Sequence, residues 1–238
     1  MKILHLITSA DKGGAESQVV NLARLQKNKN YKVLIGYVKG DGYWNKKEKG
    51  LLVNIRKNKN FYKISKFTNF ILDVFSIIKF IKQYKPNIIN VHLPYMEICL
   101  FFSLLLYKKN FKIICTKHLD NNILDGLNYQ AFLPGNIFSR IISINYDKVI
   151  AISKAVKKFY LKNKIILDPK KIEVIYYGLK LVNKDGYKKP FQLKKKYNIS
   201  ENEYVVGTIS RLVPQKSLKY LILGFNEFCN NYEKNSKL

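Results

Sequence analysis

Short runs of apolar, β-branched residues alternate with stretches of helical periodicity along most of the chain. Each run is bounded by clusters of Gly, Pro, Asn or Lys, which is typical of buried strands. The pattern predicts strands at Ile3–Thr8, Lys32–Tyr37, Leu51–Ile55, Ile88–His92, Lys112–Thr116, Val149–Ile152 and Ile172–Ile175.

Helical patterns separate most of these runs. The clearest, Asn69–Tyr84, has apolar residues at positions 70, 71, 74, 75, 77, 78 and 81, which form one stripe on a helix. Further helices are predicted at Ala15–Gln26, Tyr95–Tyr107, Ile137–Asn145 and Lys154–Asn163. Because continuous apolar strands that alternate with helices are covered on both faces, the predicted fold class is α/β with a doubly wound parallel sheet.

The pattern lapses over 180–200, a polar and lysine-rich stretch, and then a new strand, loop and helix are predicted at Tyr204–Ile209, Ser210–Ser217 and Leu218–Tyr232. We therefore expect a first domain at 1–180, a linker at 181–200 and the beginning of a second domain at 201–238. One strand and one helix cannot bury their apolar faces alone, so we expect the chain to be a fragment or a truncated product.

The composition is that of a globular protein: 238 residues, 47% hydrophobic and 25% charged, with three cysteines. Disorder and a disulfide scaffold are excluded. The net charge of +27 favours an anionic partner such as nucleic acid, a phospholipid surface or a phosphorylated ligand. Only four of the 43 basic residues are arginines, which disfavours sequence-specific base readout, and many of the lysines fit a solvated face equally well.

The longest candidate for a membrane span, Ile98–Tyr107, covers about ten residues, half of what a bilayer requires. The amino terminus resembles a first strand rather than a signal peptide. We expect a cytoplasmic protein.

A glycine turn follows the first predicted strand and leads directly into a helix. Gly13 and Gly14 let the backbone approach a ligand, and the helix amino terminus offers N–H groups to phosphate or another anion. The alternative is a tight turn in which Glu16 stabilises the first turn of the helix through its dipole.

Two of the three histidines, His92 and His118, stand at carboxyl ends of predicted strands, where open α/β sheets bind ligands. We regard His118 as the stronger site candidate. Hydrogen bonding at the sheet edge is the alternative role for both. His5 lies inside a strand and is expected to be a packed core residue.

In the second unit, Arg211 and Lys216 lie five residues apart in the loop after a strand. Two cations near a helix start can clamp a diphosphate. The sequence contains no zinc-like spacing of His and Cys, and no metal site is predicted.

Together, the glycine turn, the strand-end histidines and the loop with Arg211 and Lys216 resemble the family 4 glycosyltransferases. These enzymes have the GT-B architecture of two facing Rossmann-like domains. The matching stretches are KILHLITSADKGGAE, ICTKHLD, VIAISKAVKK, KIEVIYYGL and VGTISRLVPQKSLKYLILGF, in the family's order. The resemblance implies transfer of a sugar from a nucleotide-sugar donor, such as a UDP- or GDP-sugar, with retention of configuration and without a bound metal or cofactor.

Each candidate residue has a role by this resemblance. It implies that Gly13 and Gly14, with Glu16 grouped beside them, contact the donor, and that Arg211 and Lys216 neutralise its diphosphate. The same resemblance places His118 in the catalytic centre, where it contacts the donor sugar. We assign His92 to the acceptor side.

Three departures from the family pattern stand out. Tyr177-Gly178 replaces the family's Asn-Gly, and Lys216-Ser217 replaces its Lys-Gly. The sequence also stops at Leu238, before the family's paired glutamates and nucleotide pocket, so we expect this chain alone to be nearly inactive. The alternative function is a truncated, inactive remnant that acts as a binding module.

The acceptor is expected to be a saccharide or a lipid-linked saccharide. The basic, apolar helix Asn69–Tyr84 suggests a peripheral position on an anionic membrane. Surface polysaccharide, lipopolysaccharide and glycolipid synthesis all remain open as pathways. A nucleic-acid-binding protein lacks its recognition motif here, and a dinucleotide oxidoreductase lacks its glycine fingerprint.

Overall fold

The chain folds as two compact units, Met1–Gly178 and Leu179–Leu238, in a computed structural model. The structure describes residues 1–40, 42–56, 65–125, 134–178, 194–200, 202–232 and 236–237. Most of the expected linker, 181–200, lies outside the described residues, which resume at Lys194. The position of the expected domain boundary therefore stays a prediction.

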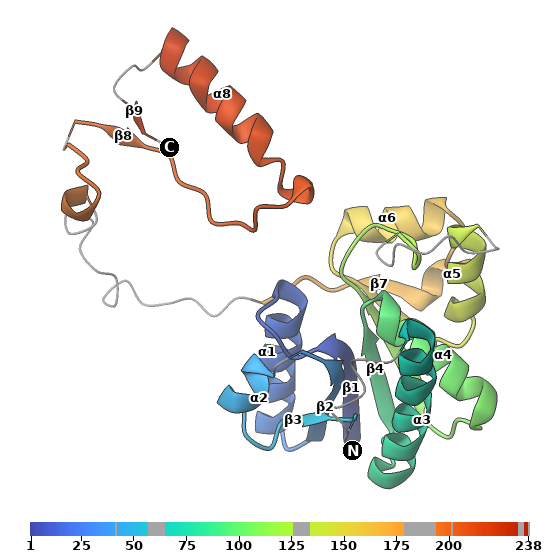
Figure 1. The fold of residues 1–238 in the computed structure, drawn as a ribbon. Helices are drawn as coiled ribbons and strands as arrows, with labels where there is room; N and C mark the ends of the chain where they lie inside the picture. The colour runs from blue at the N-terminus through green and yellow to red at the C-terminus, as the bar shows by residue number, and fades with distance from the viewer. Residues whose placement is uncertain are drawn as a thin grey trace. The chain divides into compact units, whose positions relative to one another are not determined.

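A seven-stranded sheet forms the centre of the first unit, with every pair of neighbouring strands parallel (Figure 1). Its order is β3-β2-β1-β4-β5-β6-β7. The strands are β1 (Lys2–Ser9), β2 (Lys32–Lys39), β3 (Leu52–Asn54), β4 (Ile88–His92), β5 (Lys112–Lys117), β6 (Lys148–Ala151) and β7 (Ile172–Val174). This confirms the predicted doubly wound sheet, and each strand end lies within two residues of its predicted position.

Helices cover both faces of this sheet. They are α1 (Gly14–Asn28), α2 (Tyr43–Lys47), α3 (Lys66–Tyr84), α4 (Pro94–Leu106), α5 (Gly135–Ser143) and α6 (Lys154–Lys162). The short helix α2 was not predicted, because five residues are too few to show helical periodicity. Serine side chains cap α3 and α6, where Ser65 accepts from the backbone N–H of Thr68 and Ser153 from that of Val156.

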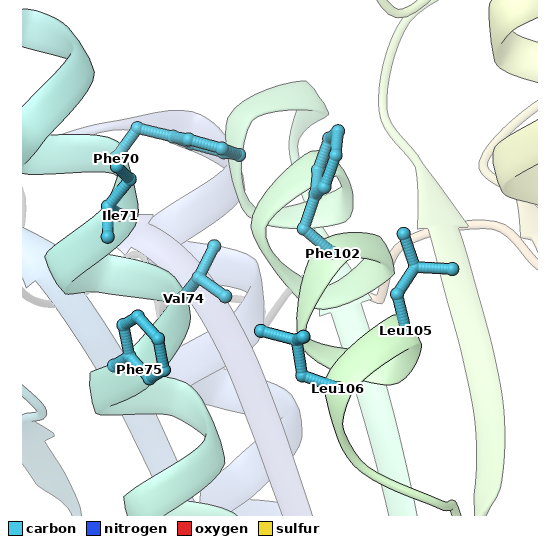
Figure 2. Close-up of a pocket in the computed structure, with 7 residues that line it drawn as sticks. All are labelled: Phe70, Ile71, Val74, Phe75, Phe102, Leu105 and Leu106. Carbon is cyan, nitrogen blue, oxygen red and sulfur yellow. The ribbon is translucent and has the colours of Figure 1, made fainter.

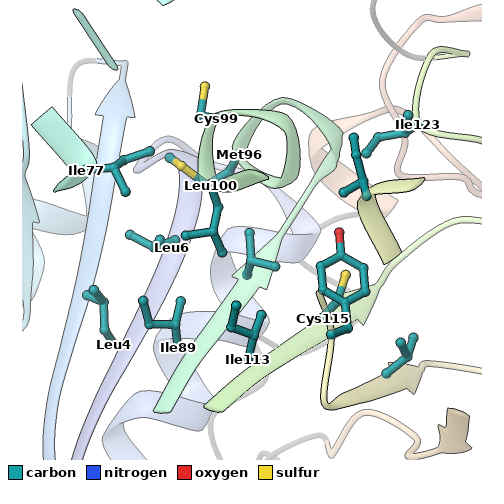
Figure 3. Close-up of a cluster of buried hydrophobic side chains, with 14 of the residues drawn as sticks. Leu4, Leu6, Ile77, Ile89, Met96, Cys99, Leu100, Ile113, Cys115 and Ile123 are labelled. Carbon is teal, nitrogen blue, oxygen red and sulfur yellow. The ribbon is translucent and has the colours of Figure 1, made fainter. Parts of the chain in front are cut away.

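Alternation along the strands divides the core into two layers. Residues 3 and 7 of β1 pack against α1, while residues 4 and 6 point to the opposite face and pack beneath α3 and α4 (Figure 3). The larger layer extends through α5 and α6 and contains Leu100, Ile113 and Cys115, each at most 1% exposed. These layers hold the carboxyl ends of β1, β4 and β5 in fixed register.

The second unit differs more from its prediction. Its strand β8 comprises only Tyr204–Val205, so the expected strand to Ile209 is wrong beyond Val205. A strand persists only where a neighbour completes its hydrogen bonds, and among the described residues β8 pairs only with the two-residue β9 (Ser236–Lys237). The predicted helix is confirmed as α8 (Leu218–Asn231).

No helix among the described residues has the length and hydropathy needed to cross a membrane.

Candidate functional site

The candidate residues of the first unit converge at one edge of the sheet. Strand order reverses at β1, which has β2 on one side and β4 on the other. Ligands of open α/β sheets bind beside the carboxyl ends of strands at such a switch point. The turn of Gly13 and Gly14 follows β1, His92 ends β4 and His118 follows β5, so this topology brings all of them to one edge.

The glycine turn is shaped by its own carboxylate. Gly13 is the N-cap of α1, and a Cβ built there would lie 2.0 Å from Oε2 of Glu16. Ser9 donates a hydrogen bond of 2.9 Å to Oε1 of the same carboxylate. Glu16 therefore folds back over Gly13 at the positive end of the helix dipole, as one of the two sequence interpretations expected.

Gly14 has no comparable steric reason to be glycine. It is exposed, and no heavy atom would lie within 4 Å of a Cβ built there. It begins α1, where backbone N–H groups have no acceptor within the helix. The open space above Gly14 is therefore compatible with an approaching ligand.

The three histidines stand in one diagonal row across the sheet. His5 of β1 is in register with Asn90 of β4, two residues before His92. His92 is in register with Thr116 of β5, two residues before His118. Because residues two apart share a face, each step toward β5 keeps the side chain on the face of α1 and moves it closer to the carboxyl edge.

Hydrogen bonds join this row from end to end. Gln26 of α1 places its Oε1 2.8 Å from Nε2 of His5. Nδ1 of His5 lies 3.1 Å from Nε2 of His92, and Nδ1 of His92 lies 3.1 Å from Nε2 of His118. The remaining nitrogen of His118, Nδ1, bonds the hydroxyl of Tyr177, just beyond β7.

Burial keeps the row uncharged at neutral pH. His5 and His92 are 0% and 1% exposed. Burial lowers the pKa of His5 to about 4, against a weaker opposing effect of the bond to Gln26. Burial also lowers the pKa of His118 to about 4, and it lowers that of His92 well below its ordinary value, with help from the other two histidines.

A buried ion pair supports the same edge from the other face. Lys117 of β5 bonds Glu97 of α4, and both side chains are at most 6% exposed. Glu97 also accepts a hydrogen bond of 2.7 Å from the hydroxyl of Tyr146, and the Lys117 ammonium lies 5.0 Å from the ring centroid of Tyr160. Buried charges are stable only when opposite charges and hydrogen bonds compensate for the loss of water. Here the bond to Glu97 also fixes Lys117, the residue before His118.

Strained backbone follows His92 directly. Leu93, the N-cap of α4, has φ 69° and ψ 144°, a region that side chains disfavour. Pro94 then begins the helix. This sharp turn ends β4 at His92 and starts α4 without an intervening loop.

The predicted cations lie in the second unit. Arg211 and Lys216 are both exposed in the segment between β8 and α8. A 3₁₀ turn at Pro214–Lys216 lies within this segment, and Ser217 with φ 53° precedes the helix. Their donor-binding role stays a prediction, as does the assignment of His92 to the acceptor side.

An apolar groove lies between α3 and α4 (Figure 2). Its volume is about 210 Å³. The lining residues are Phe70, Ile71, Val74, Phe75, Phe102, Leu105 and Leu106. Phe75, Leu105 and Leu106 are each more than half exposed, which is unusual for so many neighbouring apolar side chains.

Sequence reasoning missed several members of the site. His5 was correctly expected to be buried, but its bond to His92 was not foreseen. The register of β1 on β4 decides that bond, and a single sequence does not show register. Gln26 gave no signal in the sequence, and Tyr177 appeared there only as a departure from the family pattern. Within the described residues, no group of three or more His, Cys, Asp or Glu could hold a metal ion.

Comparison with known proteins defines the family. The sequence profile of Glycosyltransferase Family 4 matches residues 12–182, well over half of the chain. The chain therefore belongs to glycosyltransferase family 4. A search of curated proteins found no match.

Solved structures share the fold. A structure of Anabaena Alr3699/HepE in complex with UDP and glucose aligns with a TM-score of 0.70 at 19% identity, covering 95% of this chain and 58% of that one. Sucrose-phosphate synthase from Thermosynechococcus elongatus aligns with a TM-score of 0.68 at 15% identity, covering 95% and 59%.

The lipopolysaccharide outer core galactosyltransferase WaaB, in its apo form, aligns with a TM-score of 0.55 at 16% identity, covering 77% and 47%. The present chain thus spans less than two thirds of each of these relatives. The likeness establishes the α/β fold of the GT-B type.

Proposed function

We propose that this chain provides the acceptor-side domain, and the beginning of the donor-side domain, of a glycosyltransferase. The reaction moves a sugar from a nucleotide-sugar donor to a saccharide or lipid-linked acceptor with retention of configuration, in the synthesis of a cell-surface polysaccharide or glycolipid. The observation that carries this proposal is the family match over residues 12–182, on a fold whose glycine turn and His118 meet at one sheet edge.

The donor roles follow from the chemistry of this edge. The first turn of α1 offers backbone N–H groups beside Gly14, where nothing within 4 Å blocks an approaching phosphate or hydroxyl. Glu16 is an acceptor beside that space and suits a sugar hydroxyl better than a phosphate, because like charges repel. In the second unit, Arg211 and Lys216 would neutralise the departing diphosphate in place of a metal, and no cofactor is required.

Gly14 offers the sharpest test of donor binding. Gly14→Ala places a methyl group in the open space but favours the helix, so the fold is retained while the ligand is obstructed. Isothermal titration of the full chain with UDP-glucose and with GDP-glucose measures affinity. We expect at least tenfold weaker binding by Gly14→Ala. The matched control is Gly224→Ala in α8, whose Cβ would also meet nothing within 4 Å, and its affinity should equal that of the unmodified chain.

Turnover is then measured as release of glucose when water takes the place of the acceptor. Retention predicts that UDP-α-glucose releases the α-anomer before mutarotation, which proton NMR resolves. Binding without release would agree both with the expected near-inactivity of this chain by itself and with the alternative, a binding module, whereas release would contradict both. No binding of either nucleotide sugar would overturn the proposal.

We also propose a peripheral position on the cytoplasmic face of an anionic membrane. The groove between α3 and α4 exposes Phe75, Leu105 and Leu106. Exposed lysines such as Lys79 and Lys82 follow the groove residues along α3. Apolar side chains beside cations suit the boundary between acyl chains and anionic headgroups.

Co-sedimentation with phosphatidylcholine vesicles, with and without phosphatidylglycerol, tests this position. We expect binding only with the anionic lipid and a several-fold loss in Phe75→Glu. Leu167→Glu changes charge equally at a residue that is 67% exposed outside the groove, and should bind more tightly than Phe75→Glu. Binding that ignores lipid charge and Phe75 would refute the membrane role.

A further inference from the structure

We propose that His5 and His92 are positioning residues that fix the tautomer of His118. With them in place, His118 presents a lone pair on Nδ1 at the sheet edge, and the Tyr177 hydroxyl caps that lone pair until a ligand hydroxyl replaces it. The role of His118 toward a sugar rests on the function proposed above, whereas its tautomer does not.

The direction of the row follows from its first member. Gln26 faces His5 with its amide oxygen Oε1, which only accepts a hydrogen bond, and in this orientation Nε2 of His5 carries the proton. A neutral imidazole has one N–H, which leaves Nδ1 of His5 as an acceptor. Nε2 of His92 must therefore donate to it.

The same reasoning continues to the edge. With its proton on Nε2, His92 has a lone pair on Nδ1, and Nε2 of His118 donates to it. Nδ1 of His118 is then an acceptor as well, and the Tyr177 hydroxyl donates to it. All three rings are thus Nε2–H tautomers, and every ring nitrogen in the row has a partner.

Burial couples the three tautomers to one another. His5 and His92 are almost fully buried, so turning one ring alone would leave a buried donor or acceptor unpaired. The opposite direction requires all three rings to reverse together and Gln26 to present its Nε2 in place of Oε1. The depressed pKa values of all three histidines keep each ring at a single proton near pH 7. Burial also raises the pKa of Tyr177 to about 12, so its hydroxyl remains a donor.

The groups facing His118 on its other side do not disturb this state. Glu97 raises its pKa and Lys117 lowers it, and these two form an ion pair whose effects oppose each other. His118 therefore stays neutral and offers an acceptor to a hydroxyl, where an imidazolium would offer only donors. Tyr177 is 38% exposed, so its hydroxyl can be displaced from the solvent side.

The tautomers are measured directly. The chain contains three histidines, so a long-range ¹H–¹⁵N spectrum of the ¹⁵N-histidine-labelled full chain at pH 7 shows three rings. We expect the pattern of a neutral Nε2–H ring for all three. An Nδ1–H pattern for His118 would overturn the proposal, and this measurement needs neither a variant nor a substrate.

Variants then separate positioning from general packing. His92→Phe removes both hydrogen bonds of the central ring, and we expect His118 to show mixed tautomers. His92→Gln can donate at one end and accept at the other, and should restore the Nε2–H pattern. Thr116→Val is the control, because it breaks the neighbouring buried bond to Asn90 and should leave the His118 spectrum unchanged.

Two further readings complete the test. Tyr177→Phe removes the cap but not the row, so His118 should keep its tautomer while its pKa rises. UDP-glucose added to the unmodified chain should shift Nδ1 of His118. A correct tautomer without this shift would disprove the sugar contact alone, and an unchanged His118 spectrum in His92→Phe would disprove the positioning role.

Discussion

The buried imidazole of His5 should make the first unit less stable in acid, by an amount that follows from its two pKa values. Burial lowers the pKa of His5 from 6.5 to about 4, so between these values the unfolded chain binds a proton that the folded chain excludes. The free energy of unfolding that depends on neutral His5 is fully present above pH 6.5 and is lost as the pH falls toward 4.

The magnitude follows from the two pKa values. At pH 4.5 an unfolded pKa of 6.5 and a folded pKa of about 4 lower the free energy of unfolding by roughly 2.5 kcal/mol. His5→Gln keeps a donor and an acceptor at this position but removes the titration. Acidification from pH 7 to pH 4.5 should therefore lower the free energy of unfolding of the unmodified chain by roughly this amount more than it lowers that of the variant.

Urea denaturation followed by tryptophan fluorescence gives the measurement. The chain has one tryptophan, Trp44, which packs against the core layer beneath α1 and so reports unfolding of the first unit. Carboxylates titrate in both proteins and cancel in the comparison. Thr116→Val retains all three histidines and should follow the pH dependence of the unmodified chain. If His5→Gln loses as much stability on acidification as the unmodified chain does, the reasoning is refuted.

Three other predictions concern stability and use the same fluorescence assay. Ile89→Ala, at a residue that is 0% exposed, should lower the free energy of unfolding by roughly 2–5 kcal/mol, and a loss below that range would mean that the site collapses around the cavity. Ser153→Ala removes the cap of α6 and should cost about 1 kcal/mol, whereas an unchanged midpoint would show that the cap contributes nothing. Lys117→Met should cost roughly 3–5 kcal/mol because it strands the buried Glu97 carboxylate, and the double variant with Glu97→Leu should recover part of this loss; strictly additive losses would contradict the ion pair.

The fold could be predicted well because its signals are local. Apolar runs such as Ile88–His92 and the stripe on Asn69–Tyr84 report burial directly, and both were recovered within a few residues. The helix α2 carried no such signal, since five residues do not complete two helical turns. The strand predicted to Ile209 failed because apolar character does not guarantee a pairing partner.

The candidate site could be predicted only in part. Position at strand ends indicated His92 and His118, but the hydrogen bonds between them depend on register and on side-chain direction, which no single sequence shows. His5 is the clearest case: alternation correctly predicts a buried residue, yet its partner is 87 residues away. Tyr177 was visible only as a departure from a family pattern.

The strand order also has a consequence for synthesis on the ribosome. β1 is among the first segments to emerge, but its neighbour β4 follows only with Ile88, which is in register with Ile3. At roughly 5–20 residues per second, β1 and β2 can pair for about 2.5–10 s after β2 ends at Lys39 and before β4 begins. During that interval one side of β1 presents unpaired backbone groups and His5 has no histidine partner. The His5–His92 bond therefore forms only after both halves of the sheet have joined, and hydrogen exchange at β1 during translation would date that moment.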